Sequence, residues 1–311
     1  MPNACEVIRS IGVLPVINIK KPEWAEPLVQ ILLRTDIPAL EIVLRNEKAL
    51  SILAEVKKNH PEMAIGAGTV LSVAQAEAAK AAGADFIVSP GYSQAIVDWC
   101  NKNGIPAVPG CTSASEIQSA YASGLRVVKF FPAEQLGGLK MIKQLAAPFS
   151  GMKFIPTNGM TLDNIGSYLK EDCIAACGGS FMAPAAELEK GDFAKIETLC
   201  RKAMENALGF SLAHVGINAD GNEKNASAVA ALCSRFFFPN DPLVIECVRE
   251  NGRGTKGHIA IHANSVDRAV FYLKSKGVEF IPEASGKLPS GALKYIYLKD
   301  EVAGFAIHLM K

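Results

Sequence analysis

The chain has 311 residues, 49% of them apolar and 20% charged, which is typical of a globular protein long enough for two domains. Its 32 basic and 31 acidic residues leave a net charge of +1, which provides no field to hold a nucleic acid or an anionic membrane. There is no apolar run of membrane-spanning length, no secretory signal and no C-x-x-C pair among the eight cysteines, so we expect a cytoplasmic protein with reduced thiols.

Short apolar runs alternate with helical segments over the first two thirds of the chain. The eight runs cover residues 12–19, 39–45, 63–70, 85–91, 105–111, 126–132, 153–159 and 174–181. Strict alternation requires crossover connections and a parallel sheet, and eight units in about 200 residues is the count of a (β/α)₈ TIM barrel. A doubly wound open sheet is the competing interpretation, although such sheets usually have fewer strands.

Charged residues occupy one face of the second predicted strand, where the two-residue period aligns Glu41 with Val43 and Arg45. Inward-facing charges cost free energy unless they are paired or in use, so these are either a structural ion pair or part of a site. The third run ends in Thr69, which we expect to supply a hydroxyl donor at the barrel mouth.

The sixth strand contains a lysine in an apolar setting, because Lys129 shares a face with Val127 and Phe131. Burial disfavours the ammonium form of a lysine and frees the amine to attack a carbonyl group. The alternative is a lysine whose stem lies along the apolar wall while its ammonium group reaches the rim.

Two glycine-containing turns, 156–159 and 177–180, follow the seventh and eighth strands. The loops at these positions of a TIM barrel commonly bind a phosphate group through backbone N–H groups. Together with the lysine, the glutamate and the arginine, they indicate Schiff-base chemistry on a small phosphorylated keto acid.

The alternation stops near residue 205, and we place a domain boundary between residues 207 and 208, giving domains 1–207 and 208–311. The second domain contains two similar segments: 214–219 precedes a helical stretch at 226–236, and 258–263 precedes another at 266–276. Each half ends in a strand, at 244–248 and 306–310, so the sequence predicts a smaller α+β domain of paired β-α-β-β-β units.

Three histidines and a glutamate occupy matching places in these halves. His214 and His258 open equivalent strands, whereas Glu246 and His308 lie in the closing strands. Two imidazoles with a carboxylate or a third imidazole suit Zn, Fe, Ni or Mn as a divalent ion. Outside the second domain, His60 follows a helix and is expected to be a surface residue.

Six motifs of the first domain occur in the order and spacing of a known family. They are Glu41-Ile-Val-Leu-Arg45, Gly66-Ala-Gly-Thr-Val-Leu71, Phe86-Ile-Val-Ser-Pro-Gly91, Val128-Lys-Phe-Phe-Pro-Ala133, Pro156-Thr-x-Gly159 and Gly178-Gly-Ser180. Residues 5–205 thereby resemble the 2-keto-3-deoxy-6-phosphogluconate (KDPG) / 4-hydroxy-2-oxoglutarate (KHG) aldolase family. The resemblance implies a metal-free class I aldolase that releases pyruvate from a keto acid, on a (β/α)₈ barrel that is typically a homotrimer.

The same resemblance implies roles for individual residues. Lys129 would form the imine with the ketone, and Glu41 would act as general acid and base. The substrate-binding residues would be Arg45, Thr69, Phe131 and Thr157 around the pyruvyl group, Gly159, Gly178, Gly179 and Ser180 around the phosphate, and in addition Pro90. Two positions depart from the family pattern: Val43 stands where threonine is common, and Asn158 stands where glycine is common. A related galactonate-type family lacks the arginine, so Arg45 favours the gluconate-type substrate.

The second domain resembles the vicinal oxygen chelate superfamily, which includes glyoxalase-like and dioxygenase-like domains. This resemblance implies the metal ligands His214, Glu246, His258 and His308, although the superfamily usually has glutamate at the last of these positions. His262 shares a face with His258 and is an alternative ligand or base. A metal-free relative used for packing or ligand binding is the other interpretation.

The sequence is compatible with three alternative functions. The chain is a pyruvate-releasing aldolase with an accessory domain, a bifunctional enzyme whose second domain isomerises or epimerises a keto acid at a metal, or a keto-acid sensor. A sensor has no need of a buried amine, so Lys129 favours an enzyme. The sequence leaves open whether the substrate is phosphorylated.

Overall fold

The computed structural model describes residues 3–235, 244–250 and 252–311. The chain divides into two compact units, Met1–Ala207 and Leu208–Lys311. All eight cysteines are free thiols. Within the described ranges no helix is long and apolar enough to span a membrane.

Eight short strands form the centre of the first unit, one in each of the predicted apolar runs. They are β1 (Val13–Ile17), β2 (Ala39–Val43), β3 (Ala64–Gly68), β4 (Phe86–Ser89), β5 (Ala107–Pro109), β6 (Val127–Phe130), β7 (Lys153–Pro156) and β8 (Cys177–Gly179). One sheet has the order β5-β4-β3-β2-β1-β8 and a second sheet pairs β6 with β7, and every pairing is parallel. Bridges between Gly110 and Lys129, and between Thr157 and Gly178, join the two sheets at both edges, as in a TIM-barrel-like α/β fold.

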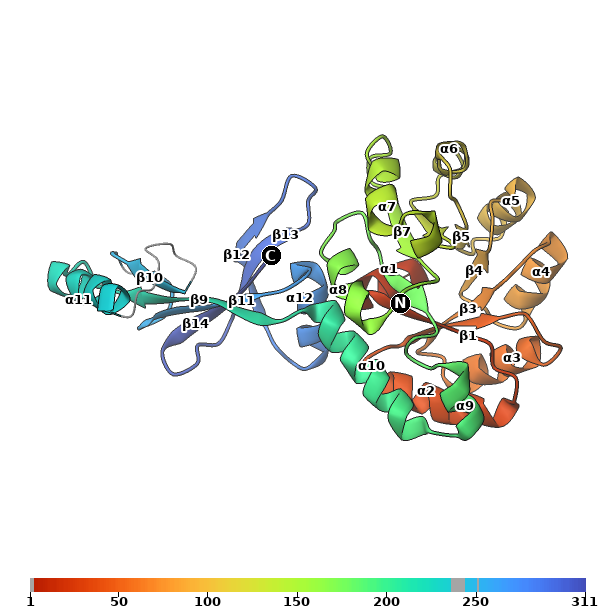
Figure 1. Ribbon diagram of the computed structural model, residues 1–311, viewed down its shortest axis with the longest axis horizontal. Helices are drawn as coiled ribbons and strands as arrows, with labels where there is room; N and C mark the ends of the chain where they lie inside the picture. Colours follow the sequence, from red (N-terminus) through yellow and green to blue (C-terminus); the bar gives the residue numbers. More distant parts are fainter. Residues whose placement is uncertain (1–2, 236–243, 251) are drawn as a thin grey trace. The chain divides into compact units, whose positions relative to one another are not determined.

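Helices follow the strands along the chain and lie around them (Figure 1). They are α1 (Ala4–Ile11), α2 (Ala25–Arg34), α3 (Ala49–Asn59), α4 (Val73–Ala81), α5 (Gln94–Lys102), α6 (Ala114–Ala122), α7 (Gly138–Ala146), α8 (Leu162–Leu169), α9 (Ala185–Lys190) and α10 (Phe193–Leu208), with 3₁₀ turns η1 (Pro22–Trp24) and η2 (Glu134–Leu136). Every residue of β2 and β3 is buried. Burial on both faces explains why the sequence shows continuous apolar runs rather than alternation.

The expectation that His60 is a surface residue was wrong, because the residue is only 8% exposed. The residue ends α3, and its ring lies between two carboxylates: Nε2 is 2.9 Å from Oε2 of Glu26, and Nδ1 is 3.5 Å from Oε1 of Glu62. The hydrogen bond with Glu26 stabilises the charged ring and raises the pKa of His60.

The second unit is built on one six-stranded sheet. Its elements are β9 (Ser211–Asn218), α11 (Glu223–Arg235), β10 (Ile245–Val248), β11 (Gly257–His262), α12 (Val266–Ser275), β12 (Phe280–Lys287), β13 (Leu293–Leu298) and β14 (Phe305–Met310), and the sheet order is β10-β9-β11-β14-β13-β12. The core packs Val266 and Ala269 of α12 against Ile296 and Leu309 of the sheet. Among the described residues, the first half thus comprises a helix and two strands, and the second half a helix and four.

Candidate functional sites

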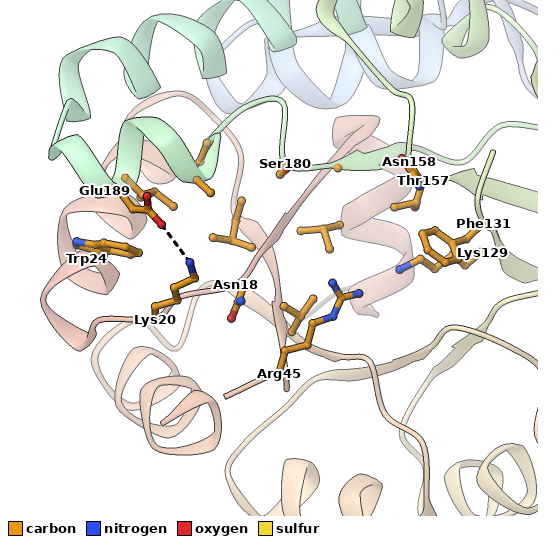
Figure 2. Close-up of a pocket in the computed structure, with 17 residues that line it drawn as sticks. Asn18, Lys20, Trp24, Arg45, Lys129, Phe131, Thr157, Asn158, Ser180 and Glu189 are labelled. Atoms are coloured by element: carbon orange, nitrogen blue, oxygen red, sulfur yellow. Dashed lines mark hydrogen bonds and ion pairs between the residues drawn. The ribbon is translucent and has the colours of Figure 1, made fainter. Parts of the chain in front are cut away.

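A pocket of about 480 Å³ lies at the carboxyl ends of the barrel strands. Its lining includes Arg45 after β2, Lys129 on β6, Phe131 after β6, Thr157 and Asn158 after β7, and Gly179 and Ser180 at the end of β8. Figure 2 shows Lys129 and Phe131 on one side of the pocket and Arg45 pointing toward them. The lining therefore collects polar side chains from four different strand ends, which is how catalytic sites of this fold are assembled.

The centre of this site is a buried ion pair between a lysine and a glutamate. Nζ of Lys129 is 3.3 Å from Oε1 of Glu41, and the two residues are 8% and 1% exposed. Burying two charges is costly, and their mutual attraction offsets that cost only when the geometry is good. The predicted inward faces of β2 and β6 thus bring together an amine and a carboxylate that can exchange a proton.

Two glycines of β3 make room for neighbouring side chains, one of them for Glu41. A Cβ atom on Gly68 would lie 2.2 Å from Oε1 of Glu41, and one on Gly66 would lie 2.2 Å from Cε2 of Phe86. Any larger residue at position 68 would displace the glutamate carboxylate. The glycines of the Gly66-Ala-Gly68 segment are therefore required by close packing rather than by backbone conformation.

Arg45 is oriented by a residue of the neighbouring strand, because its Nε donates a hydrogen bond to Oγ1 of Thr69 at 3.2 Å. Thr69 has φ 62°, an uncommon conformation for a β-branched residue. Such strain persists only where the surrounding structure imposes it, and it occurs often at functional sites. The predicted hydroxyl donor therefore accepts a hydrogen bond from the arginine.

The turn after β7 has the geometry that the glycine-rich pattern predicts. Asn158 and Gly159 have φ values of 75° and 83°, so the asparagine adopts the left-handed conformation in place of a glycine. The N–H of Ala133 holds the turn through a 2.9 Å hydrogen bond to the carbonyl of Thr157. A Cβ atom on Gly178 would lie 2.6 Å from Oγ1 of Thr157, which explains the glycine at the end of β8.

The predicted site residues do not all line the pocket. Arg45, Lys129, Phe131, Thr157, Gly179 and Ser180 do, whereas Thr69, Pro90, Gly159 and Gly178 are absent from its lining and Glu41 contacts it through Lys129. Sequence reasoning missed one whole side of the pocket, which is lined by Val16, Ile17, Asn18, Lys20, Trp24, Ala183, Ala185, Leu188 and Glu189. The rule that sites form at strand ends could have found Asn18 and Lys20, since both follow β1.

A second group of polar side chains lies on one face of the second unit's sheet. Nε2 of His214 and Nε2 of His258 are 3.0 Å apart, and Oε2 of Glu246 is 3.6 Å and 3.3 Å from them. The ring of His308 completes the group, with its centroid 5.1 Å from that of His258. The three imidazoles each offer a nitrogen within 4.8 Å of the others. His262 is not part of this group.

Strand register explains how these side chains meet. Ala260 of β11 pairs with both His214 and His308, while Gly216 of β9 pairs with both His258 and Glu246. A Cβ atom on Gly216 would lie 2.2 Å from Cε1 of His258. The long side chains therefore lean over a floor of small residues on the same face.

Burial lowers the pKa of His258, and it lowers the pKa of His308 to about 4, so these two rings favour the neutral form. Both ring nitrogens of His308 are buried, and within the described part of the chain neither has a hydrogen-bond partner. Buried polar atoms rarely remain unsatisfied. Three imidazoles that converge beside a carboxylate, one of them with no hydrogen-bond partner among the described residues, fit a divalent metal ion.

The first unit is similar in sequence to known proteins. The sequence model of the KDPG and KHG aldolase family matches residues 5–199. The chain is 40% identical over 200 residues to 2-dehydro-3-deoxy-phosphogluconate aldolase of Treponema pallidum, covering 64% of this chain and 95% of the relative. It is 39% identical over 205 residues to the KHG/KDPG aldolase of Escherichia coli K12, covering 66% and 96%.

Solved structures agree with this match. A crystal structure of KDPG aldolase from Legionella pneumophila, with pyruvate captured as a covalent carbinolamine, has a TM-score of 0.63 and 35% identity, covering 65% of this chain and 98% of that chain. KDPG aldolase of Zymomonas mobilis with 3-phosphoglycerate has a TM-score of 0.61 and 33% identity, covering 65% and 95%.

Proposed function

The chain belongs to the KDPG and KHG aldolase family, and from this premise we propose that its barrel cleaves KDPG to pyruvate and glyceraldehyde 3-phosphate, KHG to pyruvate and glyoxylate, or both. It is a class I pyruvate aldolase. The observation that carries the proposal is the buried Lys129–Glu41 pair at the pocket, with Arg45 beside it. No metal is needed, because an imine supplies the electron sink. We expect the enzyme to act in the cytoplasm as the homotrimer typical of the family.

The reaction begins when Nζ of Lys129 attacks the C2 ketone, and loss of water from the carbinolamine gives the protonated imine. Glu41 supplies and removes the protons of this step, since its carboxylate lies 3.3 Å from Nζ. The carboxylate then takes the proton of the C4 hydroxyl while the C3–C4 bond breaks and its electron pair moves to the imine. The aldehyde leaves, C3 of the enamine is protonated, and hydrolysis releases pyruvate and the free lysine.

The remaining pocket residues bind the two ends of the substrate. Arg45, held by Thr69, presents its guanidinium group to the pyruvyl carboxylate, and Thr157 and Phe131 line the same end. A guanidinium matches a carboxylate because it can donate two parallel hydrogen bonds. A phosphate group would lie against the turns that contain Gly159, Gly178, Gly179 and Ser180. Pro90 is a further substrate-binding residue by its motif.

Borohydride trapping tests this function. Pyruvate and borohydride should add a three-carbon acid to Lys129, as mapped on peptides, and Lys129→Ala should abolish both the adduct and pyruvate release. Lys153→Met, a lysine on the adjacent strand, should retain both. An adduct on another lysine, or no adduct, would exclude the Schiff-base mechanism, and a protein that binds keto acids without cleaving them would be a sensor.

A second function is supported by the unsatisfied nitrogens of His308: the second unit binds a divalent metal through His214, Glu246, His258 and His308. Zn, Fe, Ni and Mn accept such ligands, and an ion held there would polarise a carbonyl or enolate oxygen. Among the described residues, the second half of the unit has the β-α-β-β-β order of the vicinal oxygen chelate superfamily, which supports this proposal. A metal-dependent isomerase or epimerase of a keto acid would make the chain bifunctional.

Metal analysis tests this second function. We expect about one metal per chain, lost in a His214→Ala/His258→Ala double variant and retained in His262→Ala, which changes a histidine of the same strand outside the group. EDTA should leave pyruvate release unchanged and lower the melting temperature of the second unit, because metal bound only to the folded state stabilises it. Equal metal content in the double variant and the parent would refute the site.

A further inference from the structure

The catalytic pocket has a second end whose charges the proposed mechanism does not use. Chain segments after β1 and along α9 form this end, through Asn18, Lys20, Trp24, Leu188 and Glu189. Figure 2 shows the Lys20–Glu189 pair beside Trp24, on the side of the pocket away from Lys129 and Phe131. The pocket is thus longer than a site for pyruvate alone requires.

Hydrogen bonds from Asn46 fix the chain segment that precedes Lys20. Nδ2 of Asn46 donates hydrogen bonds to Oδ1 of Asn18 at 2.8 Å and to the carbonyl of Ile19 at 3.1 Å. Two residues later the chain enters η1 at Pro22, where the ring fixes the backbone. The backbone of Lys20 is therefore positioned at the pocket, and its long side chain alone is free to change partner.

The ion pair at this end is easily exchanged. Nζ of Lys20 lies 3.0 Å from Oε1 of Glu189, and the two side chains are 54% and 55% exposed. A pair this exposed contributes little net stability, because water competes for both partners. A phosphate monoester carries nearly two negative charges and three strong acceptor oxygens, so it is a better partner for an ammonium group than one carboxylate.

The charged residues that line the pocket indicate that the end at Lys20 can bind an anionic group. The cations that line the pocket are Arg45, Lys129 and Lys20, and the single lining carboxylate is Glu189. The first two are engaged at the pyruvyl end of the substrate, so Lys20 is the lining cation that remains for a second anionic group. Ser180 lies between the two ends in Figure 2 and supplies a neutral hydroxyl donor.

We propose that Lys20 is a phosphate-binding residue that Glu189 holds in the free enzyme and releases to a phosphorylated substrate. This inference rests on the aldolase function and assigns the pocket to KDPG rather than to unphosphorylated KHG. Glu189 competes with anions for the lysine, so weakly charged ligands gain less from this end than a phosphate does. Specificity then depends on the difference between binding a dianion and binding a carboxylate.

Kinetics with both substrates test the proposal, with Lys21→Met as the matched control. Lys21 precedes the same turn but lies over the ring of Trp24, its Nζ 5.4 Å from the centroid, and does not line the pocket. Lys20→Met should raise KM for KDPG about tenfold or more, the worth of a hydrogen bond to a charged group, and leave KM for KHG unchanged. Glu189→Gln should lower KM for KDPG, and Lys21→Met should change neither constant.

A direct binding measurement separates this inference from the aldolase function. Trp24 is 6% exposed and lines this end of the pocket, so its fluorescence should change when inorganic phosphate binds there. Phosphate should bind the parent and Lys21→Met, bind Glu189→Gln more tightly, and fail to bind Lys20→Met. Unchanged phosphate binding in Lys20→Met, or equal KM increases for both substrates, would overturn the role of Lys20. A parent protein that binds phosphate through Lys20 but cleaves neither substrate would refute the aldolase function and retain the phosphate site.

Discussion

Replacing Gly68 by alanine is the sharpest test of the proposed catalytic geometry, because it removes no reacting group and changes only the position of one. The added methyl carbon would lie 2.2 Å from Oε1 of Glu41, whereas ordinary contacts of this kind begin at 3.4 Å. The carboxylate must therefore move by about 1.2 Å. A misplacement of about 1 Å can cost on the order of 10²-fold in rate, which corresponds to about 2.7 kcal/mol in the activation barrier. We expect kcat of Gly68→Ala to fall by about 10² or more.

The assay follows pyruvate release and compares this variant with Gly91→Ala, since a Cβ atom on Gly91 would meet nothing within 4 Å. Borohydride should still trap pyruvate on Lys129 in Gly68→Ala, which separates a displaced acid/base from a lost nucleophile. Thermal unfolding controls for a folding defect. If Gly68→Ala folds and turns over at the rate of Gly91→Ala, then Glu41 is not the acid/base whose position limits the reaction.

Three further outcomes are expected. Glu41→Gln should lower kcat by about 10²–10⁴, the usual worth of a positioned acid/base, and a near-normal rate would make the carboxylate structural. Gly216→Ala should weaken metal binding by about 10–100-fold, measured by competition with a chelator, because its Cβ would lie 2.2 Å from Cε1 of His258; undiminished affinity would place the metal elsewhere. His60→Gln should lower the melting temperature at pH 6 and have little effect at pH 9. The pKa of His60 is raised above 6.5 by Glu26, so its stabilisation is complete below pH 6.5 and is lost as the pH rises through the raised value; equal effects at both pH values would contradict this.

Much of the catalytic site could be predicted because it depends on local pattern. The two-residue period of a strand places Glu41 and Arg45 on one face, and it places Lys129 beside Phe131 on another inward face. The fold then requires only that inward faces converge, which parallel strands of a barrel always achieve. The left-handed turn at Asn158 is local in the same way, since the residue type that tolerates this conformation stands where the turn requires it.

The unpredicted features all depend on which distant segments come into contact. His60 is buried because a carboxylate 34 positions earlier accepts its hydrogen bond. The partner of Lys20 is Glu189, which lies 169 positions later on a short helix. Neither partner carboxylate can be identified from the sequence around His60 or Lys20.

The sequence by itself determined the alternation of strands and helices, the inward faces of the strands and the lysine that we propose as the nucleophile, because hydrophobic period and residue chemistry are local properties. The tertiary structure alone decided that Gly68 clears space for Glu41, that Thr69 orients Arg45, and that the rings of the second unit meet above small residues. These contacts depend on strand register, which is set only when distant segments pack together. They also depend on distances of a few ångströms between side chains, which no pattern of residue types encodes.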